Sequence, residues 1–318
     1  MARIIQISIL VYITTFLFYG CQSDPKESDI DGDGIVDTLD KCPDIPGDSI
    51  NGGCPIIEQI DFIIETSGSM NGYVKGASTY RNIVTNLISK LESTIDPNDT
   101  NNVKILTVCD NLKKYDGGKS RFNTKLSDVL FFNGKSSKLN NIFDISTKDL
   151  KDTINHHKIV CLVSDCIMSY SDEEIINNPN INIDNASAGL KADIQTVFSN
   201  LAHRNVSSAI YAYKSHFDGK YFDCKNKATS IQHDDRPFYI WLFGKENELE
   251  YLMENINLDD REILIFRTTN NASDDISLFE EINQYQGDYN LDIGNYKIID
   301  DNTIKIKDYD DDYKISLF

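Results

Sequence analysis

Positive charge is scarce in this sequence. Its 318 residues include 31 Lys and Arg against 50 Asp and Glu, which gives a formal net charge of −19. A protein that works by neutralising a phosphate backbone needs the opposite balance. We therefore exclude nucleic acid as the expected partner.

The sequence also lacks the common signatures of catalysis. No Cys and His spacing suggests a zinc site, and the segment around Ser67 and Ser69 has no G-x-S-x-G elbow. No Cys is accompanied by a sequence feature that indicates a positioned base. We therefore expect a binding protein without catalytic residues.

An extreme composition is absent as well. Hydrophobic residues make up 40% and charged residues 25% of the chain, which is typical of globular proteins and excludes global disorder, collagen-like structure and a coiled-coil rod. At roughly 150 residues per domain, the length accommodates about two domains.

The sequence has one long apolar run, at residues 4–20, directly after Arg3. It falls slightly short of the ~20 residues that span a bilayer and indicates a secretory signal peptide over residues 1–20. Gly20 and Cys21 resemble the end of a bacterial lipobox, which implies lipidation of Cys21 and a polar tether over residues 21–28. We expect an exported protein, lipid-anchored in the bacterial outer membrane and open to surface exposure; plain secretion and an uncleaved anchor stay open as alternatives.

The cysteine count fits an oxidising compartment. Lipidation of Cys21 would leave six of the seven cysteines, an even number. The pairing of four of them stays open at this point: Cys109, Cys161, Cys166 and Cys224.

Residues 29–40, DIDGDGIVDTLD, have the spacing of a calcium loop. Gly34 stands at position 6, where such a loop turns sharply, and Ile35 at position 7 would offer its backbone carbonyl. Crowded carboxylates repel one another unless a hard cation neutralises them, and calcium prefers oxygen ligands. The predicted ligands at positions 1, 3, 5, 9 and 12 are Asp29, Asp31, Asp33, Asp37 and Asp40.

The longer stretch at about residues 29–55, DIDGDGIVDTLDKCPDIPGDSINGGCP, resembles a thrombospondin type-3 repeat. The resemblance implies that the five aspartates bind Ca2+ and that Cys42 and Cys54 form a disulfide. It also implies a small, calcium-stiffened stalk. An acidic linker without an ion is the alternative.

After Pro55, short apolar strands alternate with amphipathic helices. This pattern predicts an α/β fold with a doubly wound, mostly parallel sheet covered on both faces. Ligands of such folds bind at the carboxyl ends of the strands. We expect strands at residues 59–64, 103–108, 158–164, 206–213 and 238–243, and helices at 80–94, around 190–201 and at 246–256.

The segment FIIETSGSM resembles the opening of a von Willebrand factor A domain, a Rossmann-type fold, over about residues 57–256. In that family, a strand ending in D-x-S-x-S contributes to a metal-ion-dependent adhesion site. Ser67 and Ser69 match the two serines, and Glu65 stands where the family has Asp. Asp165, in LVSDC, matches the acid after the central strand, and Ser137 takes the place of a Thr in a second loop.

Two carboxylates and several hydroxyls at strand ends suit Mg2+ or Mn2+. An incomplete shell would leave a coordination position for a carboxylate of the partner. Glu65 is one methylene longer than Asp, which moves its carboxylate about 1.5 Å further out. A working metal site and a degenerate site in an intact fold therefore both stay open.

Two polar segments, residues 214–234 and 173–185, are predicted as long loops that carry recognition. Residues 257–318 are predicted as a small, β-rich, acidic extension, with strands at 263–266 and 303–307.

These features favour a cell-envelope lipoprotein whose A-like domain binds a protein or surface macromolecule through a divalent cation, as in adhesion. One alternative is a structural or assembly factor with a degenerate metal site. A further alternative is a metal-dependent hydrolase, in which Glu65 or Asp165 would act as general base on a metal-bound water.

Overall fold

The computed structural model divides the chain into two compact units, Met1–Pro55 and Ile56–Phe318. It describes residues 28–75, 78–95, 102–150, 157–178, 183–222, 227–258, 262–266, 296–300, 303–306 and 313–316. The predicted signal peptide, Cys21, most of the tether, and Cys224 lie outside these residues. Among the described residues, no helix is long and apolar enough to cross a membrane.

The first unit is a short stretch of turns. Its one helical element in residues 28–55 is the 3-10 turn η1 (Ser49–Asn51). Gly32 and Gly34 adopt positive φ values of 77° and 92°, which glycine tolerates without steric cost. The predicted disulfide between Cys42 and Cys54 is present.

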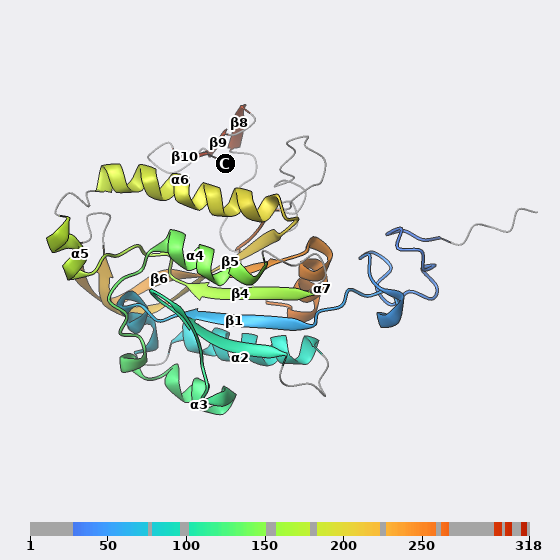
Figure 1. Cartoon of the computed structure of the whole chain (residues 1–318), viewed down its shortest axis with the longest axis horizontal. Coiled ribbons are helices and arrows are strands. Elements are labelled where there is room, and N and C mark those ends of the chain that lie inside the picture. Colours follow the sequence, from blue (N-terminus) through green and yellow to red (C-terminus); the bar gives the residue numbers. More distant parts are fainter. Residues whose placement is uncertain are drawn as a thin grey trace, which may run out of the picture. The chain divides into compact units, whose positions relative to one another are not determined.

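The second unit is built on a seven-stranded sheet, counted over the described residues, in the order β3-β2-β1-β4-β6-β5-β7 (Figure 1). Parallel ladders join β2 to β1 and β1 to β4, whereas the other neighbouring strands pair antiparallel. The strands are β1 (Gln59–Glu65), β2 (Val103–Val108), β3 (Leu112–Lys114), β4 (Lys158–Ser164), β5 (Ser207–Phe222), β6 (Ala228–Gly244) and β7 (Glu262–Phe266).

The predicted α/β architecture is confirmed, and the order β3-β2-β1-β4 is compatible with a Rossmann-like fold. The sheet is mixed: β2, β1, β4 and β5 run in one direction, and β3, β6 and β7 run in the other. The sheet is mixed in part because β5 and β6 form an antiparallel hairpin. A parallel pair would need a crossover of a dozen or more residues between them.

Helices cover both faces of the sheet (Figure 1). Alternate side chains of β1 enter opposite cores: Phe62 and Ile64 pack on the side of α2 and α7, and Ile63 packs on the side of α4 and α6. The helices are α2 (Thr79–Thr94), α3 (Gly118–Lys125), α4 (Leu139–Ser146), α5 (Asp172–Asn177), α6 (Ile183–Ala202) and α7 (Glu246–Ile256).

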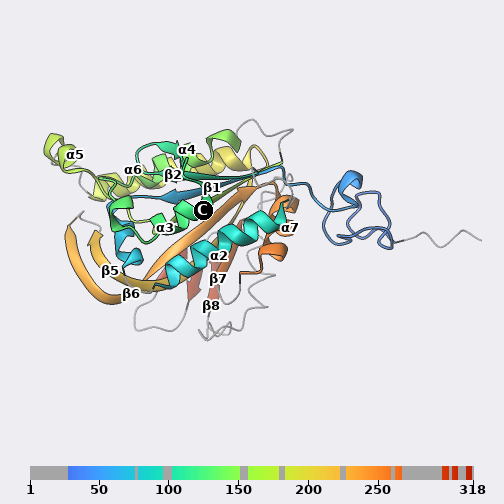
Figure 2. The same ribbon diagram turned by 90° about the horizontal axis from the view of Figure 1, so that it is seen from below.

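The prediction of a long loop at residues 214–234 is wrong. Pairing of β5 with β6 continues from Ser207 opposite Gly244 to Phe222 opposite Ala228. The ladder between β4 and β6 ends at Ser164 opposite Tyr239, so residues 214–222 and 228–236 extend past the end of β4. We call these residues the ribbon; it is the long curved hairpin of Figure 2.

The predicted loop at 173–185 is also partly wrong, because α5 and the first turn of α6 occupy its described ends. In the predicted extension, β7 joins the main sheet beside β5. A separate antiparallel sheet contains β8 (Tyr296–Asp300), β9 (Thr303–Ile306) and β10 (Tyr313–Ser316). The rest of residues 259–318 lies outside the described part of the chain.

Candidate metal centre

The sheet has a topological switch point between β1 and β4. From β1 the chain moves to β2 on one side and later returns to β4 on the other. In open α/β sheets, ligands bind at the carboxyl ends of the two strands that flank such a point. Glu65 is the last residue of β1, and Asp165 directly follows β4, so the two predicted acids lie there.

Two loops bring the predicted serines to the same edge. Ser67 and Ser69 belong to the turn that begins η2 (Gly68–Val74). A backbone bridge joins Ser67 to Gly134, in the loop after η3 (Val129–Phe131), and another joins Ser137 to Ser169. Glycine fits at position 134 because a Cβ there would lie 2.3 Å from Cys109 Sγ and 3.1 Å from Ser67 Cα.

Glu65 is held by serine hydroxyls on both carboxylate oxygens. The Ser137 hydroxyl donates to Oε1 at 2.7 Å, and the Ser164 hydroxyl donates to Oε2 at 2.5 Å. The backbone N–H of Cys166 in turn donates to the Ser164 hydroxyl at 2.9 Å. The longer side chain of Glu65 is therefore accommodated inside the fold by a fixed set of donors.

Asp165 is less completely satisfied. Its Oδ1 accepts the N–H of Ile167 at 3.0 Å, whereas its buried Oδ2 has no hydrogen-bond partner among the described residues. The Ser67 and Ser69 hydroxyls lie 2.9 Å apart. A buried carboxylate oxygen without a partner costs free energy unless a proton, water or cation reaches it.

The two acids perturb each other. Burial raises the pKa of Glu65, and hydrogen bonds from Ser164, Ser67 and Ser137 oppose that rise. Burial, followed by the nearby charge of Glu65, raises the pKa of Asp165. The Ile167 N–H, the Ser69 hydroxyl and the charge of Arg236 act in the other direction. Two adjacent buried carboxylates do not both stay ionised without compensation. The charge of Arg236, a retained proton or a bound cation supplies that compensation.

All five predicted ligands are buried: Glu65, Ser67, Ser69, Ser137 and Asp165 are each at most 3% exposed. The donor set fits a hard divalent cation, because a hydroxyl that donates its proton keeps lone pairs for a metal. The enclosure suits a small ion, whereas a partner's side chain would need the covering loops to move.

Sequence reasoning missed three residues of this centre. Ser164 lies on the strand beside Glu65, and its role follows from the parallel register of β1 and β4. The Tyr80 hydroxyl is buried without a hydrogen-bond partner among the described residues, and the charges of Asp165 and Glu65 add to the effect of burial in raising its pKa. Arg236 arrives from β6, and no local sequence signal indicates that approach.

The predicted calcium loop brings three of its acids together. Ligand oxygens of Asp29, Asp31 and Asp33 lie within 4.8 Å of one another. Burial, and then the charges of Asp33, Asp40 and Asp29, raise the pKa of Asp31, while the N–H of Asp33 opposes that rise.

The other members of the calcium loop are placed differently. One oxygen of Asp37 accepts the Ile30 N–H at 2.9 Å, and one oxygen of Asp40 accepts the Cys42 N–H at 2.7 Å. Asp40 Oδ2 is buried without a described partner. The N–H of Ile35 donates to Asp33 at 2.8 Å. Acidic clusters of this kind also occur without an ion, so calcium stays a prediction.

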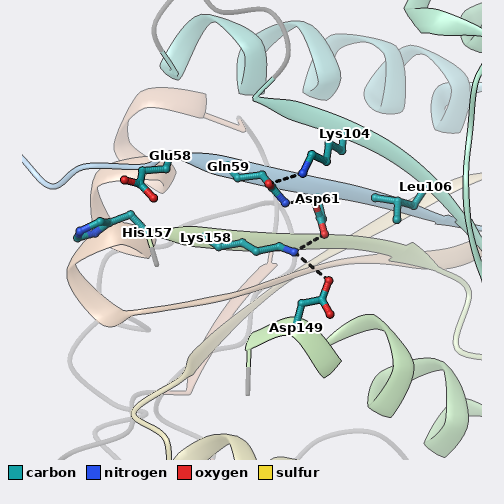
Figure 3. Close-up of a pocket in the computed structure, with 8 residues that line it drawn as sticks. All are labelled: Glu58, Gln59, Asp61, Lys104, Leu106, Asp149, His157 and Lys158. Atoms are coloured by element: carbon teal, nitrogen blue, oxygen red, sulfur yellow. Dashed lines mark hydrogen bonds and ion pairs between the residues drawn. The ribbon is translucent and has the colours of Figure 1, made fainter. Parts of the chain in front are cut away.

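A polar depression of about 460 Å3 lies at the opposite, amino edge of the sheet (Figure 3). Several of its polar groups contact one another: Lys158 Nζ lies 2.6 Å from Asp61, Gln59 donates to Asp61 at 2.6 Å, and Lys104 donates to Gln59 at 2.5 Å. Because these groups satisfy one another, we interpret them as a structural network.

Comparison with known protein families, characterised proteins and solved structures gave no match. The resemblances to a thrombospondin type-3 repeat and a von Willebrand factor A domain therefore stay predictions.

Proposed function

We propose that this chain is a cell-envelope lipoprotein whose second unit binds a protein or surface macromolecule through a divalent cation. The cation, Mg2+ or Mn2+, would be held by Glu65, Asp165 and the hydroxyls of Ser67, Ser69 and Ser137. One observation carries the proposal: two buried carboxylates converge at the switch point, and an oxygen of one lacks a partner among the described residues.

The surroundings of the centre support docking at this edge. Among the described residues of the second unit, the exposed large hydrophobic side chains are Leu130 at 78% and Ile176 at 75%. Leu130 lies in η3, which leads into the Ser137 loop, and Ile176 lies in α5, which follows Asp165. α5 lies near the carboxyl ends of β1 and β4 in Figure 1. A macromolecule docked at this edge would cover these two apolar side chains.

In the first unit, we propose that Ca2+ is bound by the aspartates of residues 29–40, with Ile35 contributing its backbone carbonyl. The support is the convergence of Asp29, Asp31 and Asp33, together with oxygens of Asp31 and Asp40 that have no partner among the described residues. The disulfide between Cys42 and Cys54 closes this unit. Its role would be that of a rigid stalk.

Calorimetric titration of Mn2+ into the full chain, with the first unit saturated by Ca2+, tests the proposal. We expect one saturable site that is lost in Ser67→Ala. Ser136→Ala is the matched control, because the Ser136 hydroxyl is also buried in this region but donates to Asp110 at 2.5 Å. Mn2+ binding that is unchanged in Ser67→Ala would reject this site.

A structural or assembly factor with a degenerate centre is the second candidate. It is favoured by the closure of the site, in which both oxygens of Glu65 already accept serine hydroxyls. It predicts no Mn2+ binding and an unchanged thermal midpoint when Mn2+ is added. The same titration separates the two candidates.

A further inference from the structure

The ribbon brings two histidines together on its outer side. His216 lies on β5 and His233 on β6, with ring centroids 5.6 Å apart and ring planes inclined by 26°. His216 is half-buried and His233 is exposed. Neutral imidazole is the commonest protein ligand for transition metals.

The register of the ribbon adds an acid to this pair. Asp235 stands directly opposite His216, so both side chains share one face. The pairing shifts between Phe217 and Gly219, and His233 lies opposite this irregularity with a φ of 57°. A non-glycine residue in the left-handed region persists where the surrounding structure fixes it. Here that conformation accompanies the stacking of the His233 ring on His216.

The inner side of the ribbon is fixed to the body of the second unit. The Ser215 hydroxyl accepts the N–H of Tyr80 at 2.9 Å, and the Phe217 ring lies 4.9 Å from that of Tyr73. A Cβ on Gly72 would lie 2.4 Å from the Phe217 ring, so that packing is close. The two imidazoles therefore stand on a backbone that is already ordered.

We propose that His216 and His233 bind one transition-metal ion, with Zn2+ as the probe, at a site separate from the carboxylate centre. Zinc takes imidazole nitrogens at about 2.0–2.1 Å in tetrahedral geometry, which places two ligand rings with centroids about 5 Å apart. The observed spacing is close to this value, and binding requires each side chain to rotate from the stacked arrangement until one nitrogen of each ring faces a shared ion.

Asp235 and water would fill the coordination positions of Zn2+ that the two histidines leave open. Among the described residues, three ligands already in mutual reach occur only at Asp29, Asp31 and Asp33. The ribbon site therefore starts from two histidines. Asp235 joins by a change of rotamer, and water fills the fourth position. The acid opposite His216 favours a cation over an anionic ligand.

Calorimetric titration of Zn2+ into the full chain, with Ca2+ and Mg2+ in excess, tests this site. We expect one Zn2+ per chain, with affinity reduced at least tenfold in His216→Asn and in His233→Asn. Asn tolerates the left-handed backbone of residue 233. His203→Asn is the matched control, because exposed His203 directly follows α6 and contacts Ser199 O of that helix at 2.6 Å. The Zn2+ affinity of this variant stays unchanged.

The ligands are identified by the electron paramagnetic resonance spectrum of bound Cu2+. We expect coupling to two imidazole nitrogens in the wild type and to one in either variant. Absence of Zn2+ binding, or equal affinity in the wild type and both variants, overturns the proposal. Ser67→Ala leaves Zn2+ binding intact, so failure at the ribbon is distinguishable from failure of the carboxylate centre.

Discussion

Asp165 gives the most direct test of the carboxylate centre at the scale of a single residue. Its side chain is 3% exposed, and one carboxylate oxygen has no described partner. The arrangement is costly when the carboxyl is ionised and no cation is present. The stability of the second unit should therefore depend on both pH and divalent cation.

With a chelator present, the wild type should lose stability relative to Asp165→Asn as pH rises. Burial and then Glu65 raise the pKa of Asp165 from 3.8 to about 8. The stability linked to this proton is complete below the unfolded pKa and is lost as pH rises through the folded pKa. Denaturant unfolding at pH 5 and pH 8 measures the effect.

We expect the wild-type minus variant difference in unfolding free energy to fall by at least about 1.4 kcal/mol, one pKa unit, between these two pH values. Saturating Mn2+ should restore the wild type at pH 8 and leave Asp165→Asn unaffected. A stability difference that does not change with pH would contradict the assignment of Asp165 as a buried acid with a raised pKa.

Gly134 is the residue that lets the two loops of the centre meet. Gly134→Ala would place a Cβ 2.3 Å from Cys109 Sγ and 3.0 Å from Thr66 O. We expect a loss of about 1–3 kcal/mol in stability, together with weaker Mn2+ binding, because the Ser137 loop is displaced. Thermal unfolding and calorimetry measure the two effects.

Gly189→Ala is its control. Gly189 lies in α6, and a Cβ added there would meet no atom within 4 Å, so alanine should stabilise the helix by roughly 0.5–1 kcal/mol. If Gly134→Ala and Gly189→Ala have the same stability and Mn2+ affinity, close packing at Gly134 contributes neither to stability nor to Mn2+ binding.

At the scale of elements, sequence periodicity predicted the parallel centre of the sheet well. The bounds of β2, β4 and α7 coincide with the predicted ranges, because continuous apolar strands and an amphipathic helix have distinctive patterns. The ribbon was not predictable in this way, since its outer residues are polar and the cross-strand pairing that orders them is non-local.

The centre itself was predictable only in part. Glu65, Ser67, Ser69, Ser137 and Asp165 are brought to one edge as expected, since β1 and β4 are adjacent parallel strands. Ser164 and Gly134 depend on register and on loop contact, which local sequence does not encode.

The amino-edge network gives a prediction at the element scale. Lys158 and Asp61 have side chains only 11% and 6% exposed and join β4 to β1. Removing one partner of a buried pair leaves the other charge uncompensated, so Lys158→Met should destabilise the fold by about 3 kcal/mol. Denaturant unfolding measures this effect.

Lys104→Met is the control for Lys158→Met, because Lys104 contacts Gln59 from an exposed position and should change stability by less than about 1 kcal/mol. A double variant, Asp61→Leu with Lys158→Met, should recover much of the loss. If Lys158→Met has the stability of the wild type, this ion pair contributes little to stability.

At the scale of the whole molecule, the chain carries three candidate cation sites: the calcium loop in the first unit, and the carboxylate centre and the ribbon histidines in the second unit. Independent units predict independent binding. Asp31→Asn should therefore weaken Ca2+ binding about tenfold or more and leave Mn2+ binding at the second unit unchanged.

The control for Asp31→Asn is Asp44→Asn, which alters an exposed acid outside residues 29–40. Calcium calorimetry on the oxidised full chain should show no effect of this control. Equal Ca2+ affinity in Asp31→Asn and the wild type would reject the calcium loop.

The central claim is that the carboxylate pair at the switch point holds a divalent cation. Anomalous diffraction from crystals of the full chain grown with saturating Mn2+ tests it most directly. The account predicts one anomalous peak within coordination distance of Asp165 Oδ2 and of the Ser67 or Ser69 hydroxyl. Ordered Glu65 and Asp165 side chains with no anomalous peak between them would contradict it.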